Sequence, residues 1–268
     1  MKLKDRKILL TGAAGGIGSA LARELIQAGA QVALLDRDEA ALDRLADELQ
    51  TADNQVFPIS VDLLDSDSRE QAIRQAETLL GHIDVLVNGA GLMSYRAFAE
   101  EDPLLLERIM QLNTIAPMLL TRQLLPSMLK RGSGQVVNIG STFGSIAFAW
   151  FAAYSASKFA LRGFSEALRR ELAGSGVSVT YIAPRAVRTK LNTEAVYQMA
   201  QATGMNMDSP DKVAQQIAQA IAGGRKDVYL GFPESWFVRI NALFPRLVDK
   251  ALRKQNATMY EFTRRQTS

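Results

Sequence analysis

The chain of 268 residues contains no cysteine and a single histidine, His82. The absence of cysteine excludes disulfides, thiolate metal sites and cysteine nucleophiles. His82 precedes a strand-like run and has no neighbouring cluster of ligands, so we expect a structural or solvated role for it and no metal site. The net charge of +3 does not provide the dense basic stripe that nucleic-acid binding needs, and we expect no nucleic-acid partner.

The sequence also lacks long hydrophobic runs, repeats and linkers. It has no apolar run of about 18 residues that would span a bilayer. The chain reaches its first strand-like run within a few residues, with no signal peptide, and we therefore expect a cytoplasmic protein. A hydrophobic content of 47% is enough for one large core. A single domain is therefore expected.

Short apolar runs alternate with helical segments along most of the chain. Such alternation favours an α/β fold, in which a doubly wound (Rossmann) parallel sheet of about seven strands carries helices on both faces. The runs that we interpret as strands are residues 7–10, 31–35, 56–61, 85–88, 135–139, 177–182 and 227–230.

A glycine-rich turn follows the first of these runs. The segment Thr11-Gly12-Ala13-Ala14-Gly15-Gly16-Ile17-Gly18 lies between a strand-like and a helix-like segment. Glycines let the backbone approach a diphosphate closely, and a helix N-terminus supplies free N–H groups. The second run ends at Asp36, where a carboxylate can accept hydrogen bonds from ribose hydroxyls and repel a 2′-phosphate. The alternative is a turn-forming glycine cluster in some other βα unit.

A further pattern joins Tyr154, Lys158 and Ser141. The tyrosine and the lysine stand four residues apart in the run YSASK, so on a helix they share one face. An ammonium beneath a phenol lowers the phenol's pKa from about 10, and a phenol tuned toward neutrality can give or take a proton at a substrate oxygen. Ser141 ends a strand-like run, and its hydroxyl could hold that same oxygen. The alternative is an exposed tyrosine and lysine on an ordinary helix.

Together, these motifs resemble the short-chain dehydrogenase/reductase family. TGAAGGIG, the NGAG of residues 88–91, Asn113, Ser141 and the Tyr154–Lys158 pair occur in the family's order and spacing, from about residue 7 to residue 229. The resemblance implies an NAD(P)-dependent enzyme that oxidises an alcohol or reduces a carbonyl.

The resemblance also implies roles by position. Tyr154 would be the general acid/base, and Lys158 would bind the nicotinamide ribose and lower the pKa of the tyrosine. Ser141 would polarise the substrate oxygen, and Asn113 would hold a water in the proton relay. Asp62 would meet the adenine amino group. The cofactor-binding residues expected in this way are Gly12, Gly16, Ile17, Gly18, Asp36, Arg37, Asp62, Leu63, Asn88, Ala90, Gly91, Tyr154, Lys158, Pro184, Val187 and Thr189. The substrate-binding residues are Met93, Ser141, Phe143 and Tyr154.

Two positions depart from the family's pattern. Gly89 replaces the second asparagine of N-N-A-G and removes a side chain that helps to stabilise the central strand. Arg185 replaces the glycine of the usual Pro-Gly, which removes backbone freedom and puts a large cation beside the expected cofactor site. An arginine there could change the loop geometry or touch an anionic group of substrate or cofactor.

Residues 190–208 correspond by position to the family's substrate lid. The lid is apolar and rich in methionine, and loops elsewhere add further apolar groups, which predicts a bulky hydrophobic alcohol or ketone as substrate. The alternative is that these groups pack against the lid itself or a neighbouring subunit. The lid contributes Leu191, Val196, Tyr197, Met199, Met205 and Met207, and the other loops contribute Leu92, Met93, Tyr95, Phe143, Phe148 and Trp150.

Residues 1–230 are expected to form the catalytic domain, and residues 231–268 an amphipathic extension of it. In this extension apolar residues recur at helical spacing with arginines and lysines between them, and Pro245 would kink or divide the helix. One interpretation is a basic segment on an anionic membrane. The other, which we favour, is packing on the sheet or across an oligomer interface.

The sequence therefore favours an oxidoreductase that moves a hydride between a nicotinamide and a hydrophobic alcohol or ketone. NAD is the preferred cofactor because of Asp36, and NADP is possible because Arg37 could clamp a phosphate. A homodimer or homotetramer is expected. The alternatives are a sensor or scaffold that binds NAD(P) without turnover, and a sugar epimerase or dehydratase, for which the chain is short.

Overall fold

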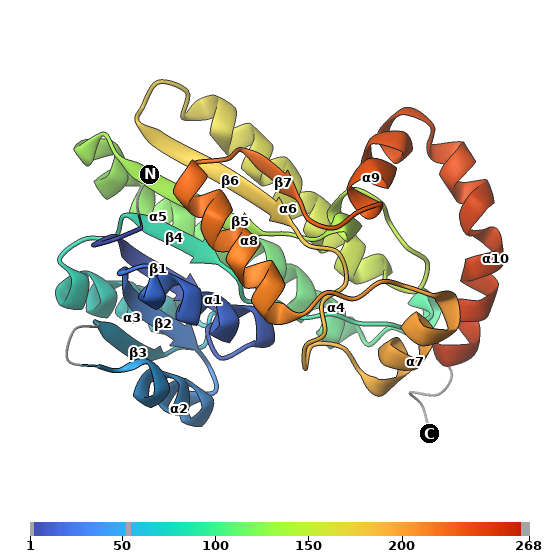
Figure 1. The fold of residues 1–268 in the computed structure, drawn as a ribbon, viewed down its shortest axis with the longest axis horizontal. Coiled ribbons are helices and arrows are strands. Elements are labelled where there is room, and N and C mark those ends of the chain that lie inside the picture. Colours follow the sequence, from blue (N-terminus) through green and yellow to red (C-terminus); the bar gives the residue numbers. More distant parts are fainter. Residues whose placement is uncertain (1–2, 52–54, 264–268) are drawn as a thin grey trace.

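The computed structural model describes residues 3–51 and 55–263. Within them, seven parallel strands form one sheet in the order β3-β2-β1-β4-β5-β6-β7 (Figure 1). The strands are β1 (Lys7–Thr11), β2 (Gln31–Asp36), β3 (Val56–Ser60), β4 (Val85–Asn88), β5 (Gly134–Ile139), β6 (Val177–Ala183) and β7 (Asp227–Tyr229). The order reverses between β1 and β4, and ligands of such sheets bind outside the carboxyl ends of the strands at this point. The expected α/β fold is confirmed, with strand ends shifted by at most one residue.

Helices cover both faces of the sheet. The helices α1 (Gly16–Gln27), α2 (Glu39–Leu49) and α8 (Pro210–Gly223) share one hydrophobic core with one face, where Leu21 and Ile217 are buried. The helices α3 (Ser66–Leu80), α5 (Ala116–Arg131) and α6 (Ala152–Glu171) share a second core with the other face. Between α3 and α5 lies the short α4 (Pro103–Met110). The central strands are buried on both sides, as the continuous apolar runs predict.

Side-chain caps begin several of these helices. Asp38, Asp65 and Asp102 accept hydrogen bonds from backbone N–H groups in the first turns of α2, α3 and α4. Ser209 caps α8 in the same way, and Pro210 occupies its first turn. These residues are preferred at such positions because they satisfy orphan donors or lack a donor. The sequence Ser209-Pro210 therefore accounts for the start of α8.

A third hydrophobic cluster lies outside the two cores of the sheet, where the lid meets the last helix of the described chain. It is built around α7 (Glu194–Thr203) and α10 (Pro245–Thr263), which lie side by side (Figure 1). Met199 of α7 and Met259 of α10 are fully buried in it. The hydroxyl of Tyr95 donates a hydrogen bond to the backbone carbonyl of Met259. The end of α10 is thus fastened to the body of the molecule.

The extension from residue 231 packs only in part. Pro245 divides it, as expected, into α9 (Glu234–Leu243) and α10. The last turns of α10 pack on α7, but Trp236 and Leu243 of α9 are 56% and 73% exposed. The expected packing on the subunit is therefore confirmed for the end of α10. Trp236 and Leu243 of α9 stay exposed in the described part of the chain, and packing of α9 across an oligomer interface stays a prediction. Residues 264–268 of the extension lie outside the described residues.

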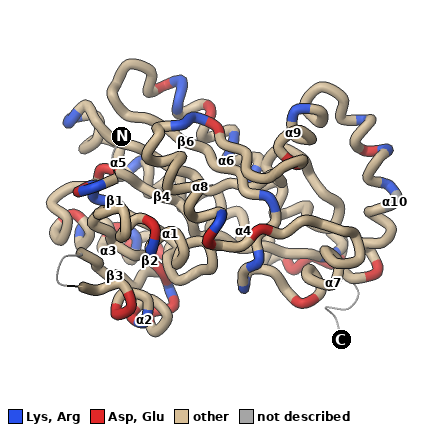
Figure 2. The backbone as a smooth tube through the Cα atoms, viewed as in Figure 1, with Lys and Arg blue, Asp and Glu red and all other residues tan. Residues whose placement is uncertain are grey.

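Charged residues of both signs are mixed over the sheet and its helices, whereas α9 and α10 carry mostly basic ones (Figure 2). In the part of the chain that the structure describes, no helix combines the length and the apolar character needed to cross a bilayer.

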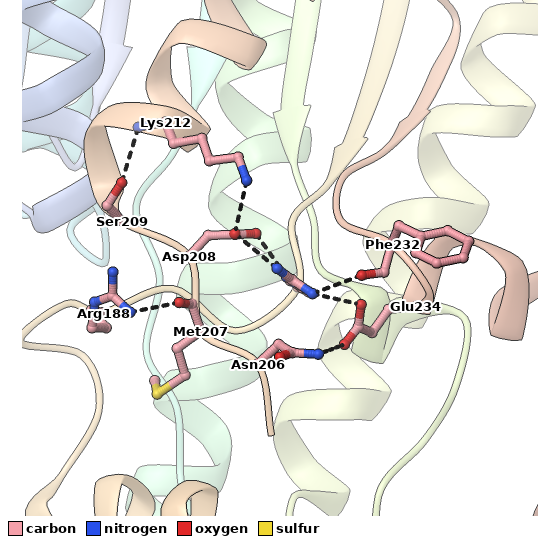
Figure 3. A network of polar contacts seen from close by, with 9 residues as sticks. Arg188, Asn206, Met207, Asp208, Ser209, Lys212, Phe232 and Glu234 are labelled. Carbon is pink, nitrogen blue, oxygen red and sulfur yellow. Dashed lines mark hydrogen bonds and ion pairs between the residues drawn. The ribbon is translucent and has the colours of Figure 1, made fainter. Parts of the chain in front are cut away.

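Arg185 joins the lid to the extension. Its guanidinium binds both carboxylate oxygens of Asp208, with Nε–Oδ2 at 2.8 Å and Nη2–Oδ1 at 2.9 Å. Its Nη1 donates to the carboxylate of Glu234 at 2.9 Å and to the carbonyl of Phe232 at 3.0 Å. Figure 3 shows Asp208, Phe232 and Glu234 converging on this one cation, with Lys212 on the far side of Asp208.

The anionic partners of Arg185 are therefore residues of this chain. The side chains of Arg185 and Asp208 are only 14% and 6% exposed, so their bidentate contact is well shielded from water and strong. The hydrogen bond from Arg185 holds the pKa of Asp208 below its usual value. The arginine in place of the usual glycine thus acts as a clamp between the end of the lid and the start of α9.

We expect Arg185→Met to destabilise the fold near neutral pH by about 2 kcal/mol. Removal of one partner from a fully buried ion pair destabilises a fold by ~3–5 kcal/mol. The loss expected here is smaller because Lys212 remains beside Asp208. Since the pKa of Asp208 is depressed in the fold, the stabilisation is present above 3.8, the usual value of an aspartate, and is lost as the pH falls through the lower folded value. Urea unfolding of both proteins over this pH range measures the difference.

Arg188→Met is the matched control, because the exposed Arg188 donates only to the carbonyl of Met207. Its effect is expected to be below about 1 kcal/mol. Equal stability of Arg185→Met and the wild type at neutral pH would show that the clamp contributes nothing.

Candidate active site

The loop between β1 and α1 requires glycine at several positions. Gly12 has φ +70°, and a Cβ there would lie 2.7 Å from the backbone of Ala90. A Cβ at Gly18 would lie 2.0 Å from the carbonyl oxygen of Gly12. At Gly16 it would lie 2.6 Å from Cγ2 of Thr189. The absence of side chains therefore lets three segments meet: the glycine-rich loop, the loop after β4 and the loop after β6.

The N-terminus of α1 opens into this meeting point. Gly15 occupies the cap position and makes no side-chain hydrogen bond to the helix, and the first turn carries no acid. The N–H groups and positive dipole of a helix N-terminus attract an anion when no side chain neutralises them. The loop and the helix start fit a dinucleotide diphosphate.

Asp36 is held rigidly at the end of β2. Its Oδ2 accepts a hydrogen bond from the backbone N–H of Ala14 at 3.0 Å, and its Oδ1 accepts from those of Arg37 and Asp38 at 2.8 and 3.2 Å. A carboxylate has about four acceptor positions, so capacity remains for one more donor. The side chain of Arg37 is exposed.

The other expected nucleotide residues fall at the same edge of the sheet, but their side chains differ in role. Asp62 is exposed after β3 and caps its own turn by accepting from Leu64, while Leu63 is buried. Asn88 is buried in the sheet, where its amide donates to Asn138 at 2.8 Å. Any contact of Asn88 with a cofactor would therefore come from its backbone.

The departure at Gly89 has a local explanation. The hydroxyl of Thr11 accepts hydrogen bonds from the N–H groups of Gly89 and Ala90 and donates to the carbonyl of Val87. A Cβ at Gly89 would lie 2.8 Å from the carbonyl oxygen of Thr11. The strand end is thus held by the Thr11 hydroxyl, and a larger residue would push β1 and this loop apart.

The structure brings Ser141, Tyr154 and Lys158 together at the carboxyl ends of β5 and β6. Ser141 follows β5 and caps the short helix η3 (Thr142–Gly144) by accepting from the N–H of Phe143. Tyr154 and Lys158 lie on the first turns of α6, and the Lys158 Nζ is 5.7 Å from the centroid of the tyrosine ring. This ammonium donates to the carbonyl of Ile139 at 3.0 Å. All three side chains are buried.

Burial dominates the protonation of this pair. It raises the pKa of Tyr154 to about 12, against which a hydrogen bond with Ser141 acts. It lowers the pKa of Lys158 to about 8. The expected lowering of the tyrosine pKa by Lys158 is therefore not found in this structure, because the phenol loses its hydration and the ammonium bonds to Ile139 instead. Burial thus favours the protonated phenol.

Asn113 holds the loop after β4 against α6. It lies in a π-helical turn, η2 (Gln111–Ile115), an irregularity often found at functional sites. Its Oδ1 accepts from the N–H of Leu92, and its Nδ2 donates to the carbonyl of Leu92 and to the hydroxyl of Ser157. The amide thus fixes Leu92 next to Ser157, the residue before Lys158. Both amide protons have protein partners, so a side-chain contact with water would use the remaining lone pair of Oδ1.

A mostly apolar cavity opens beside Ser141 and Tyr154. Of the residues expected to line it, Met93, Phe143, Leu191, Val196, Met199 and Met205 do so. Pro184, Val187, Thr189 and Ile17, expected near the cofactor, form part of the same wall. The cavity therefore joins the α1 loop, the reactive hydroxyls and the lid.

Several expected lining residues support the wall from behind. Tyr95 stacks on Phe151 with ring centroids 4.6 Å apart, and Phe148 stacks on Phe143 at 4.6 Å. Trp150 donates its Nε1–H to the carbonyl of Asn256 in α10. Phe151 lines the cavity and was not expected to. The sequence feature that could have indicated this is the position of Phe151 directly before α6, because a residue at the start of the helix that carries Tyr154 lies close to that tyrosine.

Lys158→Met is expected to stabilise the fold at neutral pH while it removes a reactive group. The ammonium loses its proton near pH 8 in the fold and near 10.5, its usual value, in the unfolded chain. Between these values the unfolded chain binds more protons, so wild-type stability rises with pH there. Below pH 8, removal of the buried charge raises the free energy of unfolding of the variant by on the order of 2–3 kcal/mol. Loss of the hydrogen bond to Ile139 offsets about 1 kcal/mol of this gain.

This advantage should shrink as the pH rises toward 10.5. Urea unfolding at about pH 7 and about pH 9.5 measures it. Lys130→Met, at an exposed position near the end of α5, is the control and should show no such trend. An advantage for Lys158→Met that does not depend on pH would contradict the assignment of a buried, titrating ammonium.

Comparison with known proteins places this site in a family. The family model for short chain dehydrogenases matches residues 6–200. Dehydrogenase/reductase SDR family member 7B of Bos taurus is 32% identical over 275 residues, covering 96% of this chain and 85% of that protein. A solved short-chain dehydrogenase from Streptomyces avermitilis is 32% identical, with a TM-score of 0.80 over 94% of this chain and 97% of its own.

A further solved structure is that of 3-ketoacyl-(acyl-carrier-protein) reductase from Brucella melitensis complexed with NADH. It is 25% identical, with a TM-score of 0.79, and the match covers 87% of this chain and 99% of that one. The seven-stranded parallel sheet with helices on both faces agrees with these solved structures. The chain belongs to the short-chain dehydrogenase/reductase family of oxidoreductases, which act on CH–OH or carbonyl groups with a nicotinamide cofactor.

Proposed function

We propose that this protein is an NAD(H)-dependent alcohol dehydrogenase or carbonyl reductase for a bulky hydrophobic substrate. The observation that carries the proposal is the joint position of Ser141 and Tyr154 at the wall of a largely apolar cavity, next to the N-terminus of α1. A polar pair that faces an apolar space suits one reacting oxygen on an otherwise hydrophobic molecule.

Each residue has a role in this proposal. The bound nicotinamide supplies or accepts the hydride. Tyr154 exchanges a proton with the substrate oxygen, and the hydroxyl of Ser141 donates a hydrogen bond to that oxygen. Lys158 holds the ribose hydroxyls beside the phenol, and Asn113 keeps the loop at Leu92 in place and positions the proton relay. The substrate's apolar part packs against Met93, Phe143 and the lid.

The protonation of Tyr154 supports carbonyl reduction as the reaction near neutral pH. A phenol with a pKa of about 12 carries the proton that a forming alkoxide needs. Alcohol oxidation instead requires the phenolate as a base, and its rate is therefore expected to increase at alkaline pH. A sensor that only binds the nucleotide would need the loop and Asp36, but it would not need a buried Ser141–Tyr154 pair at the cavity wall.

One solved neighbour supports the choice of cofactor and substrate: the ketoacyl reductase of Brucella melitensis is a complex with NADH. The reductase's name also indicates that the fold can process an acyl-linked ketone. For the present chain, Asp36 is the residue that favours NAD(H).

A homo-oligomer is also part of the proposal. Helices α4, α5 and α6 expose large apolar side chains, among them Leu104 at 63% and Leu129 at 42%. A groove between α5 and α6, lined by Met118, Leu125 and Phe164, runs along the same surface. A second subunit would cover this surface.

The direct test of the proposal is a screen of hydrophobic alcohols and ketones with NAD(H) and NADP(H), followed by the nicotinamide absorbance. We expect turnover of at least one apolar ketone with NADH. Cofactor binding without turnover across such a panel would favour the sensor.

Tyr154→Phe is expected to lower kcat by about 10²–10⁴-fold and to leave cofactor affinity unchanged, because it removes the transferable proton and keeps the ring. Tyr229→Phe is the matched control, since its hydroxyl contacts only Ser145 among the contacts found for it in the described chain. Steady-state kinetics and cofactor titration measure both effects. Near wild-type turnover of Tyr154→Phe would refute the proton-transfer role.

Asp36→Ala is expected to reduce the preference for NADH over NADPH by tenfold or more in kcat/KM. A 2′-phosphate about 4 Å from the carboxylate would be repelled by roughly 4 kcal/mol at an effective dielectric near 20, and Arg37 offsets part of this. Asp36→Asn, which keeps an acceptor for the N–H of Ala14, separates charge from loop geometry. The exposed Asp43→Ala on α2 is the control. Wild-type preference for NADPH would overturn the assignment.

A further inference from the structure

Helix α9 presents an apolar stripe to solvent. The stripe continues into the segments on either side of the helix, and its members follow helical spacing from residue 236 onward. Its exposed side chains are Phe232 at 75%, Trp236 at 56%, Phe237 at 47%, Leu243 at 73%, Phe244 at 61% and Leu247 at 60%. An exposed apolar surface of this size marks an interaction site more often than a chance arrangement.

Contacts on the opposite side of α9 keep the apolar stripe facing solvent. Val238 is 5% exposed, and the amide of Asn241 donates to the carbonyl of Ser145 at 2.9 Å. At its start, Glu234 binds the clamp residue Arg185. Because these contacts orient the helix, the exposure of the α9 stripe is a built feature of the fold.

Basic side chains accompany the stripe. Arg239, Arg246, Lys250 and Arg253 are exposed, and Asp249 is the single acid between residues 236 and 253. Figure 2 shows this surplus of basic residues along α9 and α10. The guanidinium of Arg239 lies 5.4 Å from the centroid of the Trp236 ring. An apolar face with a basic border and an interfacial tryptophan is typical of helices that lie in the headgroup region of a membrane.

The charges decide between a bilayer and a second copy of the chain. In a two-fold symmetric contact the same patch occurs on both subunits, and between residues 236 and 253 that patch carries four exposed cations but only Asp249 as an anion. An anionic lipid surface instead attracts each exposed lysine or arginine by about 1 kcal/mol. Burial of the aromatic side chains in the acyl boundary adds to this attraction.

We propose that α9 and the first turns of α10 dock this protein on the surface of an anionic lipid bilayer. The α9 stripe enters the boundary between headgroups and acyl chains, and Arg239, Arg246, Lys250 and Arg253 bind lipid phosphates and carboxylates. The protein lies on the membrane and does not span it. This proposal replaces the expectation from sequence that the whole extension packs on protein.

The test is co-sedimentation of the full chain with vesicles. Phosphatidylcholine vesicles with about 30% phosphatidylserine are compared with pure phosphatidylcholine, in low salt and in about 0.5 M salt, where charges are screened. We expect binding to the anionic vesicles, at least tenfold weaker binding in high salt and at least tenfold weaker binding to the neutral vesicles.

Variants then assign the binding to the stripe. Leu243→Glu should weaken vesicle binding at least tenfold, and Arg246→Glu should weaken it while reducing its salt dependence. Leu79→Glu is the matched control, because Leu79 on α3 is an exposed leucine (42%) outside α9 and outside the proposed subunit surface, and it should bind as the wild type does. Thermal unfolding checks that the variants fold equally well, as expected for exposed positions.

Three outcomes would overturn the proposal. The first is absence of wild-type binding to anionic vesicles, and the second is an equal loss of binding in Leu79→Glu. The third concerns sedimentation velocity without lipid: if Leu243→Glu dissociates an oligomer that the wild type forms and leaves vesicle binding unchanged, the stripe is a protein interface.

Discussion

Buried amide hydrogen bonds between β4, β5 and α6 determine where the reactive groups lie. Asn88 of β4 donates to Asn138 of β5, and Asn138 donates to the hydroxyl of Ser165 on α6, each at 2.8 Å. A slip of either strand would leave buried amides without partners, which is costly. The register therefore fixes Ser141 at the end of β5, and α6 brings Tyr154 and Lys158 to the same point.

At that point burial affects the pKa values of Tyr154 and Lys158 more than neighbouring charges do. The phenol and the ammonium are both withdrawn from water, and desolvation raises the pKa of Tyr154 and lowers that of Lys158. Burial thus favours the neutral form of both groups. The cost to stability lies in the buried lysine, a group that the fold retains because its position serves the site.

The periphery of the molecule is coupled to this site through one side chain. Arg185 forms part of the cavity wall and also binds Asp208 at the end of the lid and Glu234 at the start of α9. Arg185 therefore joins the lid, the cavity wall and the start of α9, in addition to the packing of α10 on α7. If α9 rests on a bilayer, the same connection places the cavity close to the source of a hydrophobic substrate.

Much of the fold could be predicted from the sequence because its signals are local. Apolar runs of strand length, the caps at Asp38, Asp65 and Ser209, and the break at Pro245 depend on neighbours along the chain. The glycines at 12, 16 and 18, Asp36 and the Tyr154–Lys158 spacing marked the site for the same reason. Their family resemblance added the positions of Ser141 and Asn113.

The sequence by itself therefore determined the fold class and the family, and it marked the residues that we propose as the reactive group. Only the tertiary structure decided how these and other residues are placed: that Ser141, Tyr154 and Lys158 are buried together, that Arg185 binds Asp208 and Glu234, and that α9 leaves its apolar stripe exposed. These properties depend on burial and on partners far away in the chain, such as Ser145 for Asn241 and Ile139 for Lys158. Periodicity predicts that a helix has an apolar face, but what covers that face is set by the packing of the whole chain.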